Sequence, residues 1–194
     1  MTDSNGRQRV GILALQGDFE AHAKIVSSLG ADPVEVRVPA DLDGLDALII
    51  PGGESTVMTL GIERERLAEP LRALVGGGTP VLGTCAGMIM LDRDHLGVLD
   101  VSTRRNAFGR QLRSFEADLD VAGVEGGPVH AVFIRAPWVT AHGPAVEVLG
   151  TVDDHPVAIR QGNLLAVSFH PELSGETRLH ELLLAMGNGR PDPG

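Results

Sequence analysis

The first half of the chain alternates short apolar segments with segments of helical spacing, and this alternation limits the possible folds more than any other feature. The apolar segments, each interpreted as a buried strand, are Val10–Leu15, Pro33–Val38, Leu45–Ile50 and Pro80–Gly83. Helical spacing covers Phe19–Leu29 and Leu60–Val75, and each of these helices ends at glycine, a common C-terminal signal. Strands that alternate with helices at such short intervals predict a parallel sheet with helices on both faces.

The second half of the chain contains further strands, separated by glycine, proline and aspartate turns. The segments interpreted as strands, some of them antiparallel, are Phe115–Val121, Val129–Ile134, Val146–Val152, Val157–Arg160 and Leu164–Phe169. A closing helix is expected over Gly175–Met186. The predicted fold is therefore α/β in three layers: an open, mostly parallel sheet with helices on both faces and additional antiparallel strands in the second half.

A chain of 194 residues with no internal repeat and no long linker is expected to form one domain. We place this domain over 9–187, between a flexible N-terminal segment, 1–8, and a flexible C-terminal tail, 188–194. The tail carries two prolines and two glycines, and chain ends of this kind commonly fray.

Charge and aromatic content exclude several classes of protein. The net charge of −10 disfavours binding to nucleic acids and to anionic membranes, because both require a basic protein surface. Aromatic residues, which stack against bases, make up only 3% of the chain. No apolar run approaches the roughly 20 residues of a transmembrane helix, and residues 1–8 lack the apolar core of a signal peptide. Cys85 is the only cysteine, so no intramolecular disulfide is possible, and a cytoplasmic location is expected.

Gly83-Thr84-Cys85-Ala86-Gly87 has the pattern Gly-x-Cys-x-Gly between a predicted strand and a predicted helix. This is the cysteine form of a nucleophile elbow, a turn so tight that the residues flanking the nucleophile must be small. At the start of a helix, the positive end of the helix dipole favours a thiolate. An isolated cysteine is more often a buried, unreactive thiol. A strand-to-helix turn flanked by glycines nevertheless favours Cys85 as a nucleophile.

A cysteine nucleophile needs a histidine that accepts its proton and returns it to the leaving group. His170 follows the apolar strand Leu164–Phe169, so it is expected at the sheet edge where open α/β sheets place their sites. Residues two apart in an extended segment project to one side, so Glu172 is placed to fix the tautomer of His170. The histidines expected to be solvated instead are His22 and His180 in helices, and His95, His142 and His155 in polar turns.

Pro51-Gly52-Gly53-Glu54-Ser55 also closes a predicted strand and precedes a helix. Backbone amides exposed at such a point can hold a developing negative charge, so the amides of Gly53 and Ala86 are the expected oxyanion-hole donors. Glycine-rich turns before helices are common, and this segment alone is a weak signal. Arg105 and Arg135 are candidates for pairing with a substrate carboxylate, although a surface arginine without such a role is the commoner case.

Together these motifs resemble those of class I glutamine amidotransferases, which carry a cysteine triad. Three further stretches narrow the resemblance: Leu15-Gln16-Gly17, Arg105–Gln111 with Ser114-Phe115-Glu116, and Phe133–Pro137. With them the sequence looks like the glutaminase subunits of pyridoxal 5'-phosphate synthases, over nearly the whole of Val10–Met186.

The resemblance implies a flavodoxin-like fold and an enzyme that hydrolyses L-glutamine to L-glutamate and ammonia. It implies Cys85 as the nucleophile, His170 as the acid and base, and Glu172 as the residue that orients His170. The residues that it implies for glutamine binding are Gly53, Glu54, Ser55, Arg105, Ile134 and Arg135, with Gln16 near the oxyanion hole.

The resemblance also implies a partner. Glutaminases of this family use no metal or cofactor and pass ammonia to a separate (β/α)₈-barrel synthase. The synthase combines it with a pentose phosphate and a triose phosphate to make pyridoxal 5'-phosphate. In the family, the glutaminase is nearly silent alone, and docking on the synthase completes the oxyanion hole near Gly53.

Three alternatives stay open at this point. The chain could be the glutaminase of another biosynthetic amidotransferase, which the Arg105–Gln111 and Phe133–Pro137 stretches disfavour. It could be a stand-alone γ-glutamyl hydrolase, which would turn over glutamyl substrates without a partner. It could also be a non-catalytic binding module, although such a protein would typically have lost part of the triad.

Overall fold

The structure is a computed structural model that describes residues 6–108 and 114–187. The predicted tail, 188–194, and most of the predicted N-terminal segment, 1–8, lie outside the described residues, as do Gly109, Arg110 and Gln111. The flexibility of both ends and the single-domain boundaries therefore stay predictions.

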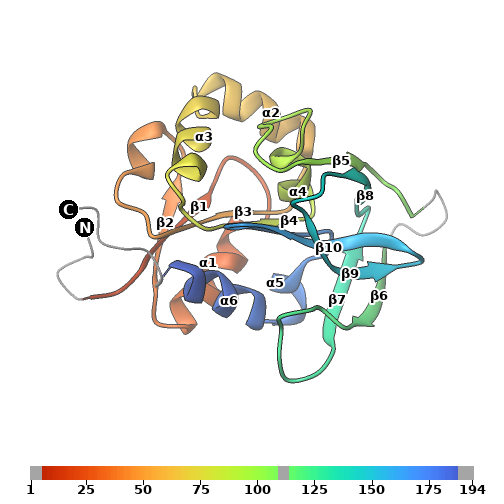
Figure 1. Ribbon diagram of the computed structural model, residues 1–194. Coiled ribbons are helices and arrows are strands. Elements are labelled where there is room, and N and C mark those ends of the chain that lie inside the picture. Colours follow the sequence, from red (N-terminus) through yellow and green to blue (C-terminus); the bar gives the residue numbers. More distant parts are fainter. Residues whose placement is uncertain (1–5, 109–113, 188–194) are drawn as a thin grey trace.

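A seven-stranded sheet runs through the centre of the molecule in the order β2-β1-β3-β4-β11-β10-β9 (Figure 1). Neighbours from β2 to β11 are parallel, whereas β10 is antiparallel to both β11 and β9. The strands are β1 (Arg9–Leu13), β2 (Asp32–Val36), β3 (Ala47–Ile50), β4 (Val81–Thr84), β9 (Glu147–Val152), β10 (His155–Gln161) and β11 (Leu164–Val167).

Helices cover both faces of this sheet. Figure 1 shows α2, α3 and α4 on one face and α1, α5 and α6 on the other. The helices are α1 (Phe19–Ser28), the 3₁₀ helix η1 (Pro39–Leu42), α2 (Ser55–Arg64), α3 (Ala68–Gly76), α4 (Ala86–Leu91), α5 (Pro171–Ser174) and α6 (Arg178–Gly187). Because both faces are covered, the central strands β3, β4 and β11 are buried at every position. None of the helices in the described ranges is long and apolar enough to cross a membrane.

Two small antiparallel sheets accompany the main one: β5 (Val101–Arg104) with β8 (Trp138–His142), and β6 (Ser114–Leu119) with β7 (Val129–Ile134). The predicted α/β fold, with a mostly parallel sheet and antiparallel strands in the second half, is confirmed. The sequence pattern missed β5 and β8. Both are short, and β8 buries only Val139 fully, so neither shows the regular alternation that identifies a strand.

The prediction of one helix over Leu60–Val75 is wrong. The structure has two helices, because α2 begins at Ser55 and ends at Arg64, and α3 begins at Ala68. Arg66, between them, takes a left-handed backbone conformation with φ of 57°, and Leu67 is fully buried. The break turns the chain so that Leu67 enters the core, and no glycine or proline between Arg64 and Ala68 signals it in advance.

The prediction of one closing helix over Gly175–Met186 is also wrong in where the helix begins. The four-residue helix α5 precedes Gly175, and α6 begins only at Arg178. Gly175 has φ of 69°, a left-handed conformation that glycine adopts without steric cost, so it ends α5 instead of starting a helix.

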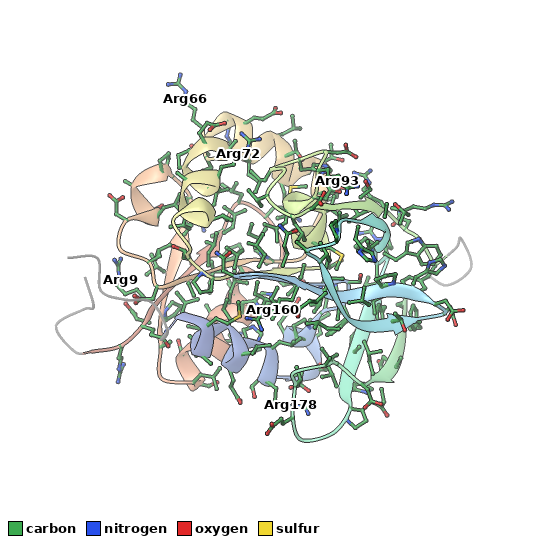
Figure 2. The ribbon with its side chains drawn as sticks, in the orientation of Figure 1. Arg9, Arg66, Arg72, Arg93, Arg160 and Arg178 are labelled. Carbon is green, nitrogen blue, oxygen red and sulfur yellow. The ribbon has the colours of Figure 1, made fainter. Side chains whose placement is uncertain are left out.

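Two arginines, Arg72 and Arg178, connect these helices to loops through hydrogen bonds; both side chains are labelled in Figure 2. Arg178, at the start of α6, donates hydrogen bonds to the carbonyl oxygens of Glu125, Gly127 and Pro128, in the loop between β6 and β7. Arg72 of α3 donates from Nε to the Leu96 carbonyl oxygen at 2.8 Å. Both side chains thereby connect a helix to the backbone of a loop far away in the sequence.

Candidate active site

The carboxyl ends of β1, β3, β4 and β11 meet at one edge of the sheet, where open α/β folds bind ligands. α1 follows β1 on one face and α2 follows β3 on the other, so the chain changes face at this point. A cavity of about 400 Å³ lies at this edge, a size that suits a small metabolite. The cavity is lined by Gln16, Gly17, Asp18, Gly53, Glu54, Ser55, Cys85, Ala86, Ile89, Arg105, Asn106, Ile134, Arg135, Pro137 and His170.

The structure thus brings every residue singled out by the sequence to one cavity, with one exception. Glu172 does not line the cavity and instead lies behind His170, with its side chain fully buried.

Cys85 sits at a strained turn between β4 and α4. Its backbone has φ of 48° and ψ of −107°, a region that residues with a side chain rarely occupy. Its N–H donates to the Val167 carbonyl oxygen at 2.8 Å, which ties the turn to β11. Such strain persists only where the surrounding structure enforces it, and here it directs the side chain of Cys85 into the cavity.

The glycines of the elbow are explained by close backbone approaches. A Cβ atom on Gly87 would collide with the carbonyl oxygen of Ile50, at the end of β3. A Cβ atom on Gly83 would lie 2.9 Å from the carbonyl carbon of Gly87, closer than real side chains come. Gly83 and Gly87 therefore let α4 pack directly on the strands β3 and β4.

His170 and Glu172 form a short, buried contact beside Cys85. His170 Nδ1 lies 2.6 Å from Glu172 Oε1, and the side chains are 7% and 0% exposed. Burial alone lowers the pKa of His170, but hydrogen bonds with Cys85 and Glu172, and their charges, raise it to about 10. The imidazole therefore carries its proton at neutral pH and places a positive charge beside the side chain of Cys85.

This raised pKa gives a pH prediction. Rising pH removes the proton that His170 would give to a leaving group, so turnover by Cys85 and His170 should fall with a midpoint near pH 10. An ordinary histidine would lose its proton near pH 6.5. The measurement is the pH dependence of kcat/KM for the amide substrate. An alkaline limb near pH 6.5 would contradict the assignment of His170 as the acid.

Two backbone amides are available at the cavity as an oxyanion hole. Within the described ranges, neither the Gly53 N–H nor the Ala86 N–H donates a hydrogen bond to another protein group. The neighbouring Glu54 N–H is engaged, since it donates to Gln16 Oε1 at 2.6 Å. A Cβ atom on Gly53 would collide with the same Gln16 Oε1, so glycine at 53 leaves room for Gln16 beside the hole.

Two arginines provide positive charge at the cavity of this acidic protein. Arg105 Nη1 donates to Ser55 Oγ at 2.7 Å and to Thr56 Oγ1 at 3.2 Å, which holds it against the start of α2. Arg135 is exposed and has φ of 46°, so the backbone is strained there too. The carbonyl oxygen of Ile134, the residue before it, lies 3.8 Å from Cys85 Sγ.

Sequence reasoning missed several residues of the site. Asp18 and Asn106 line the cavity, and a Cβ atom on Gly52 would collide with His170 Cε1, so Gly52 lets the imidazole approach Cys85. Asp18, His170 and Glu172 each bring one potential metal-ligand atom within 4.8 Å of the others. Since His170 Nδ1 already binds Glu172, we assign this cluster to the triad. No motif in the sequence identifies Asp18. Asn106 lies within the Arg105–Gln111 stretch but was not singled out there.

The prediction that His22 and His180 are solvated is wrong. They are 0% and 1% exposed, and they lie directly behind Glu172. Helical spacing places a histidine on a helix face but does not say whether polar partners from other segments allow it to be buried.

Comparisons with known proteins identify the family of the chain. The model of the SNO glutamine amidotransferase family matches residues 12–187. A relative from Frankia alni, named pyridoxal 5'-phosphate synthase subunit PdxT, is 56% identical over 94% of this chain and 98% of its own length. A relative of the same name from Acidothermus cellulolyticus is 52% identical over 96% of this chain and 97% of its own length.

Solved structures agree with the fold. A crystal structure of a glutamine amidotransferase superposes with a TM-score of 0.87 at 46% identity, covering 92% of this chain and 98% of that one. The structure of PurLQS from Thermotoga maritima superposes with a TM-score of 0.67 at 17% identity, covering 94% of this chain and 98% of that one, and supports the fold alone. Taken with the strained cysteine turn and the histidine–glutamate contact at one cavity, the match over 12–187 shows that the chain belongs to the SNO glutamine amidotransferase family.

Proposed function

We propose that this chain hydrolyses the side-chain amide of L-glutamine to give L-glutamate and ammonia, with Cys85, His170 and Glu172 as the triad. The observation that carries the proposal is that a strained cysteine at a strand-to-helix turn shares one cavity with a histidine held by a buried glutamate. This arrangement supplies a nucleophile, an acid and base, and an orienting carboxylate, the three groups that acyl transfer needs.

The proposed chemistry follows from these positions. The Cys85 thiolate attacks the amide carbon, and the amides of Gly53 and Ala86 hold the resulting oxyanion. His170 gives its proton to the amide nitrogen, and the C–N bond breaks. Ammonia departs, and a γ-glutamyl thioester remains on Cys85. A water molecule then gives a proton to His170 and attacks the thioester, which releases glutamate and the thiolate.

Glutamine recognition is assigned to the rim of the cavity. The α-carboxylate of glutamine is expected to pair with Arg105 or Arg135, because guanidinium groups bind carboxylates through paired hydrogen bonds. The start of α2, with Glu54 and Ser55, supplies a carboxylate and a hydroxyl for the α-amino group. Ile134 and Gln16 complete the lining beside Cys85 and Gly53.

The ammonia is proposed to serve a partner subunit. Relatives that are 52–56% identical carry the name of a pyridoxal 5'-phosphate synthase subunit. The Arg105–Gln111 and Phe133–Pro137 stretches of this chain also resemble that family. We assign the same role to this chain. It would be a glutaminase that docks on a (β/α)₈-barrel synthase and needs no cofactor. A nucleophilic thiol must stay reduced, which favours work in the cytoplasm.

The test is ammonia release from glutamine with and without the barrel synthase. We expect the wild-type chain to be nearly idle alone and to become active when the synthase is added, because in the family that the sequence resembles docking on the synthase completes the oxyanion hole near Gly53. Synthases from other ammonia-using pathways serve as controls and should leave the chain idle. Full activity of the isolated chain would contradict partner control and favour a stand-alone γ-glutamyl hydrolase, and activation by another synthase would reassign the pathway.

A further inference from the structure

Two buried histidines, His22 of α1 and His180 of α6, lie behind the triad on the face of the sheet that carries α5. They come from segments far apart in the sequence, and Figure 1 shows α1, α5 and α6 side by side on that face. His22 and His180 are 0% and 1% exposed, and neither lines the active-site cavity. We refer to them as the histidine pair. The reaction proposed above gives them no task.

The histidine pair continues the line of side chains that starts at Cys85. His170 Nδ1 contacts one carboxylate oxygen of Glu172, Oε1, at 2.6 Å. The other oxygen, Oε2, is buried and accepts no hydrogen bond of good geometry within the described ranges. His22 Nε2 lies 3.3 Å from that oxygen, with both side chains fully buried. His22 is therefore placed to satisfy the half of Glu172 that His170 leaves free.

The contacts of His22 determine which ring nitrogen carries the proton. Nε2 lies 3.3 Å from Glu172 Oε2 and 3.3 Å from Thr84 Oγ1. An unprotonated Nε2 would direct its lone pair at the carboxylate of Glu172, and two acceptors repel each other. The proton therefore belongs on Nε2. Nδ1 is then a free acceptor, and His180 Nε2 lies 2.8 Å from it and can donate. His180 thus favours the His22 tautomer whose N–H faces Glu172.

Both histidines are neutral in this arrangement. Burial, followed by the neighbouring His180 and His170, lowers the pKa of His22 well below its ordinary value. Burial lowers the pKa of His180 to about 4, against the opposing influence of Glu176 and Glu181. The charged groups around His22 are thus His170 after β11 and Glu172 of α5. A neutral His22 can donate a hydrogen bond to the Glu172 carboxylate, and the negative charge of Glu172 remains available to His170.

We propose that His22 is a positioning residue of the triad: its Nε2–H holds the second carboxylate oxygen of Glu172, and His180 selects the tautomer that makes this proton available. Through Thr84, which directly precedes Cys85, His22 also joins the strand of the nucleophile to the carboxylate that orients His170. The inference rests on the proposed glutaminase reaction.

The test compares two substitutions at His22 in the complex with the synthase. His22→Leu removes the N–H that lies 3.3 Å from the buried Glu172 Oε2, whereas His22→Gln keeps an N–H in reach of it. We expect His22→Leu to lower kcat by roughly 10–100-fold, with KM unchanged, by analogy with the loss found when a group that orients a metal ligand is removed. His22→Gln should recover most of the lost rate.

A second readout separates positioning from stability: the pH dependence of Cys85 alkylation by iodoacetamide, which reports the thiolate. Without the His22 N–H beside its second oxygen, the Glu172 carboxylate is held less firmly against His170 and supports the charge on His170 less well. The rate of alkylation rises with pH, and the midpoint of this rise (the acid limb) should therefore move to higher pH. We expect a shift of about one pH unit in His22→Leu and a smaller shift in His180→Leu. Val26→Ala, on the same helix and 1% exposed, is the matched control and should lower the melting temperature without moving this limb.

The proposal is overturned if His22→Leu keeps wild-type kcat and the wild-type alkylation profile, or if His22→Gln is no better than His22→Leu. Should His22→Leu fail to fold, His180→Leu decides, and an unmoved acid limb in that variant overturns the proposal. Absence of ammonia release by the wild-type complex would instead refute the proposed glutaminase function, and alkylation of Cys85 would still test the histidine pair.

Discussion

Cys85→Ala is expected to abolish ammonia release, with a loss of about 10⁶-fold in kcat, the size found when the nucleophile of a comparable triad is removed. The reason is that the thioester can form only on Cys85, the one cysteine of the chain. The measurement is ammonia or glutamate release from glutamine in the presence of the synthase, at saturating substrate.

Alanine at position 85 keeps the turn as strained as cysteine does, so the fold should be unchanged. The control is glutamine binding to Cys85→Ala in the complex, which should stay close to the wild-type KM. An inactive variant that also fails to bind glutamine would indicate a damaged cavity. A variant with wild-type rate would refute Cys85 as the nucleophile.

Glu172→Gln is expected to lower kcat by about 10⁴-fold, as the equivalent change does in a serine triad, although the shape of the side chain is kept. A glutamine amide has one N–H₂ group and one oxygen, whereas the structure requires an acceptor on both sides. If the N–H₂ group faces His170 Nδ1, the imidazole takes the wrong tautomer. If it faces the other way, it meets His22 Nε2, which lies 3.3 Å from Glu172 Oε2.

Kinetics as a function of pH provide the control for Glu172→Gln. Glu172 is one of the groups that raise the pKa of His170 to about 10, so the alkaline limb of kcat/KM should move to lower pH in the variant. KM should change little, because Glu172 does not line the cavity. A loss of activity that is due entirely to KM, with the alkaline limb unmoved, would show that Glu172 does not act through His170.

Most of the fold could be predicted because its signals are local. Buried strands such as Ala47–Ile50 are apolar at every position, and Gly30 after Phe19–Leu29 marks a helix end whatever packs against it. The break at Arg66 could not be predicted in this way. It depends on the burial of Leu67 by the rest of the core, and the residues there are compatible with a continuous helix.

In the candidate site too, the local motifs could be predicted from the sequence. Gly83-Thr84-Cys85-Ala86-Gly87 and His170-Pro171-Glu172 each lie within a few residues, so spacing alone indicated a nucleophile and an oriented histidine. The parallel order β3-β4-β11, itself expected from the alternation of elements, then brings the two motifs to one edge. The sequence by itself therefore determined the α/β fold and the pairing of Cys85 with His170.

Only the tertiary structure decided what supports Glu172. His22 and His180 lie 158 residues apart, and their helices carry no motif that links them to the triad. A histidine is apolar enough to be buried and polar enough to be solvated, so helical spacing leaves its environment open. Its burial depends on partners that other segments supply, here Thr84, Glu172 and a second histidine, and these come within reach only when α1, α5 and α6 pack on one face of the sheet.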